Sequence, residues 1–203
     1  GLVETMADTA TVVPYYDLSF QHAAPKVLRR MRRFGDPEAF LGLLGRIRSR
    51  TPHAGIRSNV IVGFPGETEA DVDLLAGFLE QARLDAVGVF AYSDEEGTEA
   101  YGLPDHVAPE VVAERMDRIV TLTQNLMEQR ADERIGERVR VLVESVEDGV
   151  ATGRAAHQGP DVDPVCHIED PGPEVQVGGF IWGRVTATDG VDLIVKEEGP
   201  HGR

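Results

Sequence analysis

Ile61-Val-Gly-Phe-Pro-Gly-Glu-Thr68 and Gly88-Val-Phe-Ala-Tyr-Ser-Asp-Glu-Glu-Gly-Thr98 decide the fold of this chain. Each stretch begins as an apolar strand and runs directly into a loop that contains glycine. A helical pattern lies between them, so we expect two parallel strands joined by a right-handed crossover. In α/β proteins, the loops at the carboxyl ends of such strands bind ligands. The two stretches therefore predict a ligand site at one edge of a parallel sheet.

The sequence on either side continues the alternation of strands and helices. Pro25 and Asp36-Pro37 start helices, because proline at the first helical position loses no hydrogen bond and aspartate caps the free amides. Thr68 caps the next helix, with Asp71 completing a capping-box variant. We expect strands over residues 12–17, 56–62 and 87–92, and a long linking helix over 109–135. Three strands leave an edge and apolar surface uncovered, so residues 1–135 are predicted to be the C-terminal half of a (β/α) barrel.

The pattern changes at Gly136, after which short alternating segments replace the helices. Strands are expected over residues 139–146, 175–185 and 191–195, with a hairpin at Asp148-Gly149. Short strands leave many open edges unless the sheet closes on itself. The predicted fold class is therefore α/β plus all-β, with a small antiparallel β-barrel over 136–203.

The single cysteine, Cys166, restricts the chemistry of the chain. One cysteine forms no internal disulfide and cannot ligate an iron–sulfur cluster by itself, and this usage suits a reducing cytoplasm. His167 lies beside it, but no second pair completes a zinc site, so both are interpreted as strand residues. The sequence has neither an apolar run of membrane-spanning length nor a signal peptide at its start. Because it also lacks an initiator methionine, it is interpreted as the middle of a longer protein.

The net charge of −15 is spread unevenly along the chain. Residues 1–58 carry nine Lys and Arg against five Asp and Glu, for a net +4. Residues 59–135 carry five against seventeen (−12), and residues 136–203 carry six against thirteen (−7). Such a surface repels phosphate backbones and favours a basic partner. The alternative is an acidic surface that serves only solubility.

Several residues at the expected strand ends are candidates for ligand contacts. Gly63 and Gly66 allow a close approach of the backbone, although the Gly-Lys-Ser/Thr ending of a phosphate loop is missing and a simple strand-to-helix turn remains an alternative. Gln21 and His22 follow the first strand and could hold polar ligand groups, or could be structural. The basic residues of 1–58 are mostly expected on solvated helix faces.

Among the basic residues of 1–58, Arg33 and Arg57 are the better candidates for binding a carboxylate. Asp94-Glu95-Glu96 forms an acidic rim without metal-binding spacing, and a solvated loop is the plain alternative.

The sequence resembles the methylthiotransferase branch of the radical S-adenosylmethionine (radical SAM) enzymes. The resemblance covers essentially the whole chain, and a TRAM domain of that family corresponds to residues 136–203. It is carried by four stretches, at residues 14–23, 28–33, 61–68 and 88–98. Ser19 departs from the proline that is common in the family, which loosens that loop without threatening the match.

Within this branch, the chain is most similar to the type that methylthiolates the β-carbon of an aspartate in a small-subunit ribosomal protein (protein twelve). The tRNA-modifying type usually has arginine in the loop where this chain has Glu95. A barrel that holds tRNA should be basic, whereas this one carries a net −7, so a basic ribosomal protein is the expected partner and direct tRNA binding is not. A tRNA adenosine methylthiotransferase and a non-catalytic acidic protein-binding module remain the alternatives.

The resemblance also implies cofactors: S-adenosylmethionine and two [4Fe-4S] clusters held by cysteines of the full-length protein. Those cysteines are absent here, so the chain should contain no metal ligands and no catalytic residues, and should be inactive alone. By resemblance, Glu95 and Glu96 face the substrate. The residues expected around S-adenosylmethionine are Gln21, His22, Arg33, Arg57, Val62, Gly63, Gly66, Phe90 and Tyr92.

Overall fold

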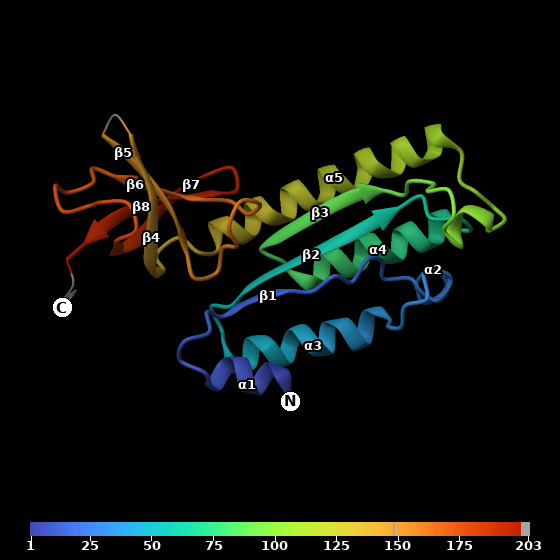
Figure 1. Cartoon of the computed structure of the whole chain (residues 1–203), viewed down its shortest axis with the longest axis horizontal. Coiled ribbons are helices and arrows are strands. Elements are labelled where there is room, and N and C mark those ends of the chain that lie inside the picture. The colour runs from blue at the N-terminus through green and yellow to red at the C-terminus, as the bar shows by residue number, and fades with distance from the viewer. Residues whose placement is uncertain (148, 200–203) are drawn as a thin grey trace. The chain divides into compact units, whose positions relative to one another are not determined.

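A computed structural model describes residues 1–147 and 149–199 of the chain (Figure 1). These residues divide into two compact units. The α/β unit consists of Asp17–Arg50 and Arg57–Leu126, and the barrel unit consists of Gly1–Tyr16, Thr51–Ile56 and Met127–Arg203. The predicted division into domains at residues 135 and 136 remains a prediction.

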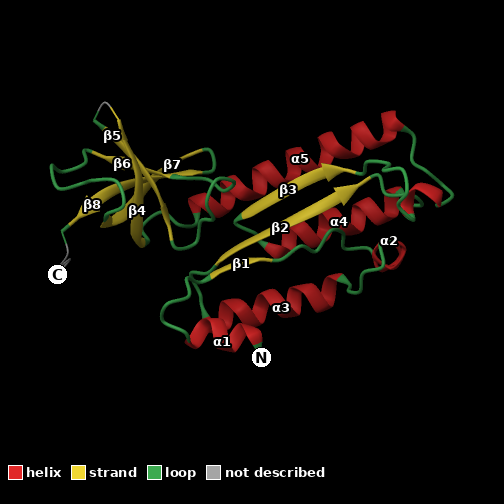
Figure 2. Ribbon diagram, in the orientation of Figure 1, coloured by secondary structure: helices red, strands yellow, loops and turns green. Residues whose placement is uncertain are grey.

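The expected parallel arrangement is present in the three-stranded sheet of order β1-β2-β3 (Figure 2). Strands β2 and β3 are parallel neighbours, with Ile61 opposite Phe90. The sheet consists of β1 (Tyr15–Asp17), β2 (Gly55–Val62) and β3 (Ala86–Ala91). The helices in this part of the chain are α2 (Pro25–Arg30), α3 (Pro37–Arg50), α4 (Glu69–Ala82), the short 3-10 helix η1 (Ala100–Gly102) and α5 (Pro109–Asp132).

Local capping signals fix where these helices begin. The carboxylate of Asp36 accepts a hydrogen bond from the Ala39 amide at 2.8 Å, as the sequence predicts for the start of α3. Thr68 caps α4 in a complete capping box with Asp71. Helix α5 ends at Asp132, three residues earlier than expected. The chain leaves it through a turn in which Gly136 has a φ of +90°, a value that glycine adopts without strain.

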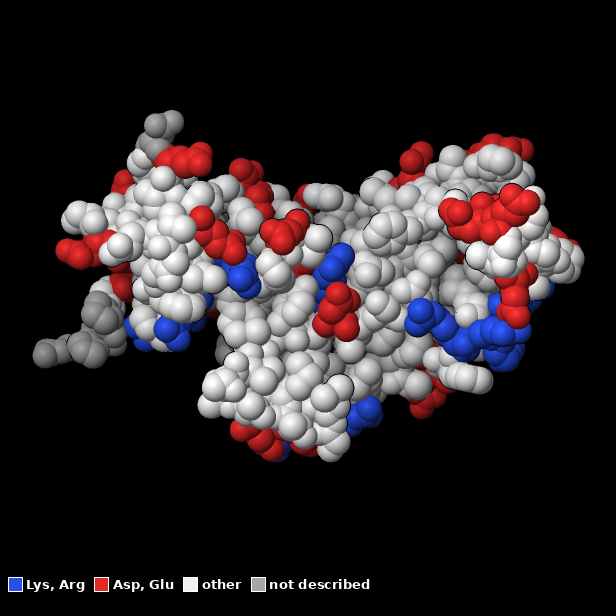
Figure 3. Space-filling view, viewed as in Figure 1, with Lys and Arg blue, Asp and Glu red and all other residues white. Residues whose placement is uncertain are grey.

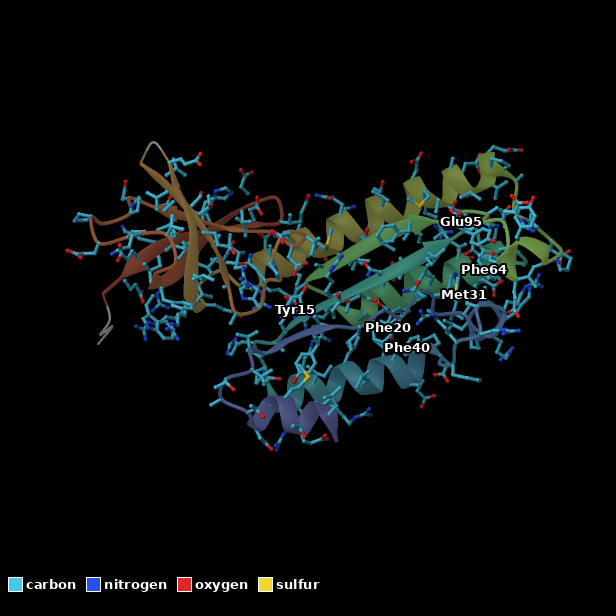
Figure 4. The ribbon with its side chains drawn as sticks, viewed as in Figure 1. Tyr15, Phe20, Met31, Phe40, Phe64 and Glu95 are labelled. Carbon is cyan, nitrogen blue, oxygen red and sulfur yellow. The ribbon has the colours of Figure 1, made fainter. Side chains whose placement is uncertain are left out.

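The face of the sheet that meets the helices is closely packed. Ile56, Val60 and Val62 alternate along β2 and are fully buried. Phe20 contacts Phe40 with ring centroids 4.4 Å apart, and both rings pack against Phe78 of α4 (Figure 4). This aromatic cluster joins the loop after β1 to α3 and α4, and so holds the carboxyl ends of the strands in place.

The barrel unit contains α1 (Leu2–Asp8) and a closed barrel of strand order β4-β5-β6-β8-β7. The strands are β4 (Arg138–Glu147), β5 (Val150–Ala155), β6 (Cys166–Glu169), β7 (Phe180–Asp189) and β8 (Asp192–Glu198). Closure and the strand role of Cys166 and His167 are confirmed. The expectation of a purely antiparallel barrel is wrong in one place, because β6 and β8 pair in parallel.

One expected strand starts too early. Residues 175–179 lie outside any strand, with a turn at Val177 and Gly178, and β7 begins only at Phe180. Gly178 has a φ of +81° and donates from its amide to the Val143 carbonyl, which places it in a turn against β4. The expected hairpin falls between β4 and β5, which pair antiparallel. Its residue Asp148 lies outside the described residues.

Among residues 1–147 and 149–199, no helix has both the length and the apolar character needed to cross a membrane.

Candidate functional site

A cavity of about 580 Å³ lies at the carboxyl ends of the strands in the α/β unit. Its floor is apolar, because Phe64 packs with Val27 and Ala24 and is flanked by Met31, Tyr92 and Leu103. Its rim is charged: Arg32 pairs with Glu99 at 2.7 Å. Figure 4 shows Met31 and Phe64 close together at this end of the unit. The lining residues are Gln21, Arg30, Met31, Arg32, Arg33, Ile61, Phe64, Tyr92, Glu99, Ala100 and Leu103.

Arg30 lines this cavity and is held in place by the loop that follows η1. Its Nη2 donates to the Pro104 carbonyl at 2.8 Å and its Nη1 lies 3.7 Å from a carboxylate oxygen of Asp105. Its Nε is buried and has no hydrogen-bond partner among the described residues. The guanidinium lies so close to Gly66 that a Cβ there would come within 2.6 Å of Cζ, and Gly66 has a φ of +82°. Gly66 is therefore required both by the turn and by the place of Arg30.

Tyr92 separates this cavity from a second one of about 420 Å³, which is lined by Gly63, Tyr92, Asp94, His106, Val107, Pro109 and Val112. The Tyr92 ring packs edge-on against Phe64 with centroids 5.0 Å apart. Burial of the hydroxyl, the main cause, and the nearby carboxylates of Asp94 and Glu95 raise the pKa of Tyr92 to about 12. The phenol therefore stays protonated at neutral pH, in a negative local field.

The structure brings together some of the residues predicted for the site. Gln21, Arg33 and Tyr92 all line the larger cavity. The backbone of Gln21, in an unusual conformation with a φ of +68°, bonds to β2 through its amide to Asn59 and through its carbonyl to the Ile61 amide. These contacts fix the loop after β1 against the end of the sheet. Phe90 stands opposite Ile61 in the register and is half exposed.

Other predicted site residues lie elsewhere in the α/β unit. Arg57 lies along β2, 3.5 Å from the carboxylate of Asp17 and 3.4 Å from the amide oxygen of Asn59. His22 is fully buried and does not line the cavity, because its ring bonds to Glu67 and to the backbone. Val62 is also fully buried.

The predicted substrate-facing residues lie in an exposed loop. Glu95 accepts a hydrogen bond from Ser93, and Glu96 is exposed. In Figure 3, acidic and basic side chains gather at this end of the α/β unit. The roles of all these residues as ligand or substrate contacts remain predictions.

Sequence reasoning did not find three residues of this region: Arg30, Glu67 and Arg115. Arg30 looked like one of several arginines on a solvated helix. Glu67 follows Gly66 directly, and a carboxylate just after a glycine turn is a signal that could have drawn attention to it. Arg115 lies in the long amphipathic helix, and nothing in the sequence pairs it with a residue 48 positions away.

The cavity fits one of the implied cofactors and not the other. The guanidinium groups of Arg30 and Arg33, which both line the cavity, suit a carboxylate, while Ile61, Phe64 and Leu103 suit a flat apolar ring, so S-adenosylmethionine fits. An iron–sulfur cluster does not fit the residues present. Within the described part of the chain no three His, Cys, Asp or Glu are grouped to hold a metal, and the one cysteine is buried in the barrel.

Comparison with known proteins finds a family match for the barrel and relatives that cover nearly the whole chain. The model of the TRAM domain family matches residues 135–196. The ribosomal protein uS12 methylthiotransferase RimO of Kineococcus radiotolerans is 60% identical over 97% of this chain and 41% of its own length. RimO of Saccharopolyspora erythraea is 57% identical over 98% of this chain and 41% of its own length. A solved structure, the radical SAM enzyme coproporphyrinogen III oxidase (HemN) from Escherichia coli, covers 58% of this chain and 27% of its own at 18% identity and a TM-score of 0.44.

The described chain is thus a parallel α/β segment followed by a β-barrel that the TRAM domain model matches. More particularly, the chain is homologous over nearly all its length to the RimO uS12 methylthiotransferases. It spans about two fifths of the length of the curated relatives that it matches.

Proposed function

We propose that this chain is part of a cytoplasmic radical SAM methylthiotransferase that modifies the β-carbon of an aspartate in the ribosomal protein uS12. The observation that carries the proposal is the identity of 60% to a RimO over 97% of the chain. The acidic loop at Glu95 and Glu96 and the net −7 of residues 136–203 add to it, since ribosomal proteins are basic. Residues outside this chain would ligate the clusters, so the chain alone would be inactive.

In this proposal the larger cavity holds part of S-adenosylmethionine, which supplies the hydrogen-abstracting radical and the methyl group when bound. The guanidinium groups of Arg30 and Arg33 would bind its carboxylate, and Gln21 would offer an amide to its polar groups. Ile61 and Phe64 would exclude water from the adenine side. The chain's own contribution is thus to orient the cofactor and to shield it.

The test is a binding and modification assay with the anaerobically reconstituted full-length protein. It should bind S-adenosylmethionine and add a methylthio group to uS12, as seen by mass spectrometry of the digested ribosomal protein. Arg30→Met should weaken cofactor binding while leaving uS12 binding unchanged. A protein that binds the cofactor but leaves uS12 unmodified would contradict the proposed substrate.

One observation favours a second candidate, a methylthiotransferase that acts on tRNA. On the outer face of β4 and β7, Arg138 stacks over Trp182 at 4.5 Å and Arg140 over Phe180 at 4.0 Å. Arginine beside aromatic rings is typical of surfaces that bind nucleic acid. Preferential retention of tRNA over uS12, lost in Arg140→Ala, would favour this second function. Binding of uS12 that weakens with added salt would favour the first.

A further inference from the structure

Three ionisable side chains form a closed network beneath the larger cavity. The side chains of His22 and Glu67 are fully buried, and that of Arg115 is 8% exposed. One oxygen of Glu67 accepts from the Gly63 amide at 2.9 Å and from Arg115 Nη1 at 2.9 Å. Its other oxygen lies 3.2 Å from His22 Nε2. The carboxylate therefore binds three different segments: the loop after β1, the loop after β2 and helix α5.

The tautomer of His22 follows from its second contact. Its Nδ1 accepts the backbone amide hydrogen of Ala24 at 2.9 Å, so the ring proton must be on Nε2. The Nε2–H then donates to Glu67, and both nitrogens of the ring are used. This leaves His22 no free group to offer a ligand, which separates its role from that of its neighbour Gln21 in the cavity.

The network controls the two loops that form the cavity. His22 follows Gln21 directly, and Gly63 precedes Phe64, so each anchored residue stands next to one that lines the cavity. Gly63 and Gly66 have φ values of +81° and +82°, which turn the chain so that Glu67 can reach back to the Gly63 amide. Arg115 also donates to the Glu67 carbonyl at 3.3 Å, which fixes the backbone of the same turn.

We propose that Glu67 is a positioning residue for the cofactor site: it holds Gln21 and Phe64 at the distance that S-adenosylmethionine requires. The proposal rests on the function proposed above. Only an acceptor with two oxygens satisfies three donors here. Glutamine would turn its own amide hydrogens toward at least one of them, and the loop that loses its bond would be released.

Glu69 provides a matched control, because it binds the same guanidinium of Arg115 as Glu67 does. The Arg115 guanidinium lies 2.7 Å from the Glu69 carboxylate, and the Glu69 side chain is 65% exposed. Glu69→Gln removes a carboxylate from the same arginine without touching either loop. Any effect that is specific to loop position should appear in Glu67→Gln and not in Glu69→Gln.

The experiment measures the dissociation constants of S-adenosylmethionine and of uS12 for the full-length reconstituted protein, without turnover. In Glu67→Gln we expect cofactor affinity to fall about tenfold, the effect of one lost hydrogen bond to a charged group, while uS12 affinity stays unchanged. Glu69→Gln should keep both affinities within about twofold of the wild type.

Glu67→Gln leaves the buried Arg115 with only the exposed Glu69 as a charged partner, which lowers stability, so a second variant is needed. Glu67→Gln with Arg115→Gln removes both buried charges together and should restore the melting temperature. The His22 donor still lacks its acceptor in this double variant, so cofactor affinity should remain about tenfold low.

A folded double variant with wild-type cofactor affinity would overturn the positioning role, as would an equal loss in Glu69→Gln. Both outcomes leave the proposed function intact. A wild-type protein that binds no S-adenosylmethionine would instead remove the proposed function, and this inference with it.

Discussion

The inside of the barrel and the strand ends of the α/β unit are built in opposite ways. The barrel interior is a cluster of Ala, Val, Ile and Leu residues with the buried Cys166. The strand ends bury a glutamate, a histidine and an arginine beneath an apolar cavity floor. Apolar packing is sufficient to close a barrel. Buried charge is costly unless it is fully paired, so the three paired side chains at the strand ends mark a place where loop geometry matters.

The largest effect on stability is expected at the buried charges. Glu67→Ala removes the acceptor of His22 and of the Gly63 amide and leaves Arg115 with only the exposed Glu69. It should lower the free energy of unfolding of the α/β unit by about 3–5 kcal/mol. Chemical denaturation followed by far-UV circular dichroism measures this. A loss below about 1 kcal/mol would mean that water satisfies these groups, and the contrast between the two regions would disappear.

Substitutions in the apolar interior of the barrel should lower the free energy of unfolding through lost packing alone. Leu193 is 1% exposed, so Leu193→Ala creates a cavity and should cost about 2–4 kcal/mol in the barrel unit. Leu193→Met, which nearly conserves volume, should cost less than about 1.5 kcal/mol. Equal losses in the two variants would argue against a closely packed interior.

The reactivity of the Cys166 thiol tests whether the same interior is closed, without a mutation. Burial, the main cause, raises the pKa of its thiol to about 12. A thiol reagent at pH 8 should therefore react slowly with the folded chain and rapidly after denaturation. Because the folded-state pKa lies above the unfolded one, the stability that this thiol contributes is complete below pH 9 and is lost as the pH rises toward 12. Fast labelling of the native chain would contradict the closed barrel.

The smallest effect is expected at an ion pair on the surface. Arg154 donates to Glu144 at 2.6 Å across β4 and β5, but both side chains are partly exposed. Arg154→Gln should change the free energy of unfolding by at most about 1 kcal/mol, and less at high salt. A loss as large as that of Glu67→Ala would show that ion pairing contributes more than burial to the free energy of unfolding.

The sequence predicts those helix starts and turns that local chemistry determines. Asp36 before Pro37, Thr68 with Asp71, and the glycines at 63 and 66 each act within a few residues, and the structure confirms the elements that they mark. The capping bonds at these positions form whatever the rest of the chain does. The parallel pairing of β2 with β3 and the closure of the barrel could be predicted for a related reason, since only a few topologies satisfy the observed pattern.

What the sequence did not predict depends on contacts between distant residues. Alternation cannot reveal that β6 pairs in parallel with β8, nor that Gly178 turns against Val143. The sequence places His22 beside Gln21 at a strand end but does not reveal that its ring contacts Glu67, 45 residues away. Polar residues at a strand end serve either the ligand or the loop, and only three-dimensional contacts separate the two roles.

The central claim is that this chain belongs to an enzyme that modifies uS12, and one measurement tests it most directly. The full-length protein, reconstituted anaerobically with S-adenosylmethionine, is given uS12 and tRNA together, and both products are analysed by mass spectrometry. The account predicts a methylthio group on an aspartate of uS12 and unmodified tRNA. Methylthiolated tRNA with unmodified uS12 would contradict it.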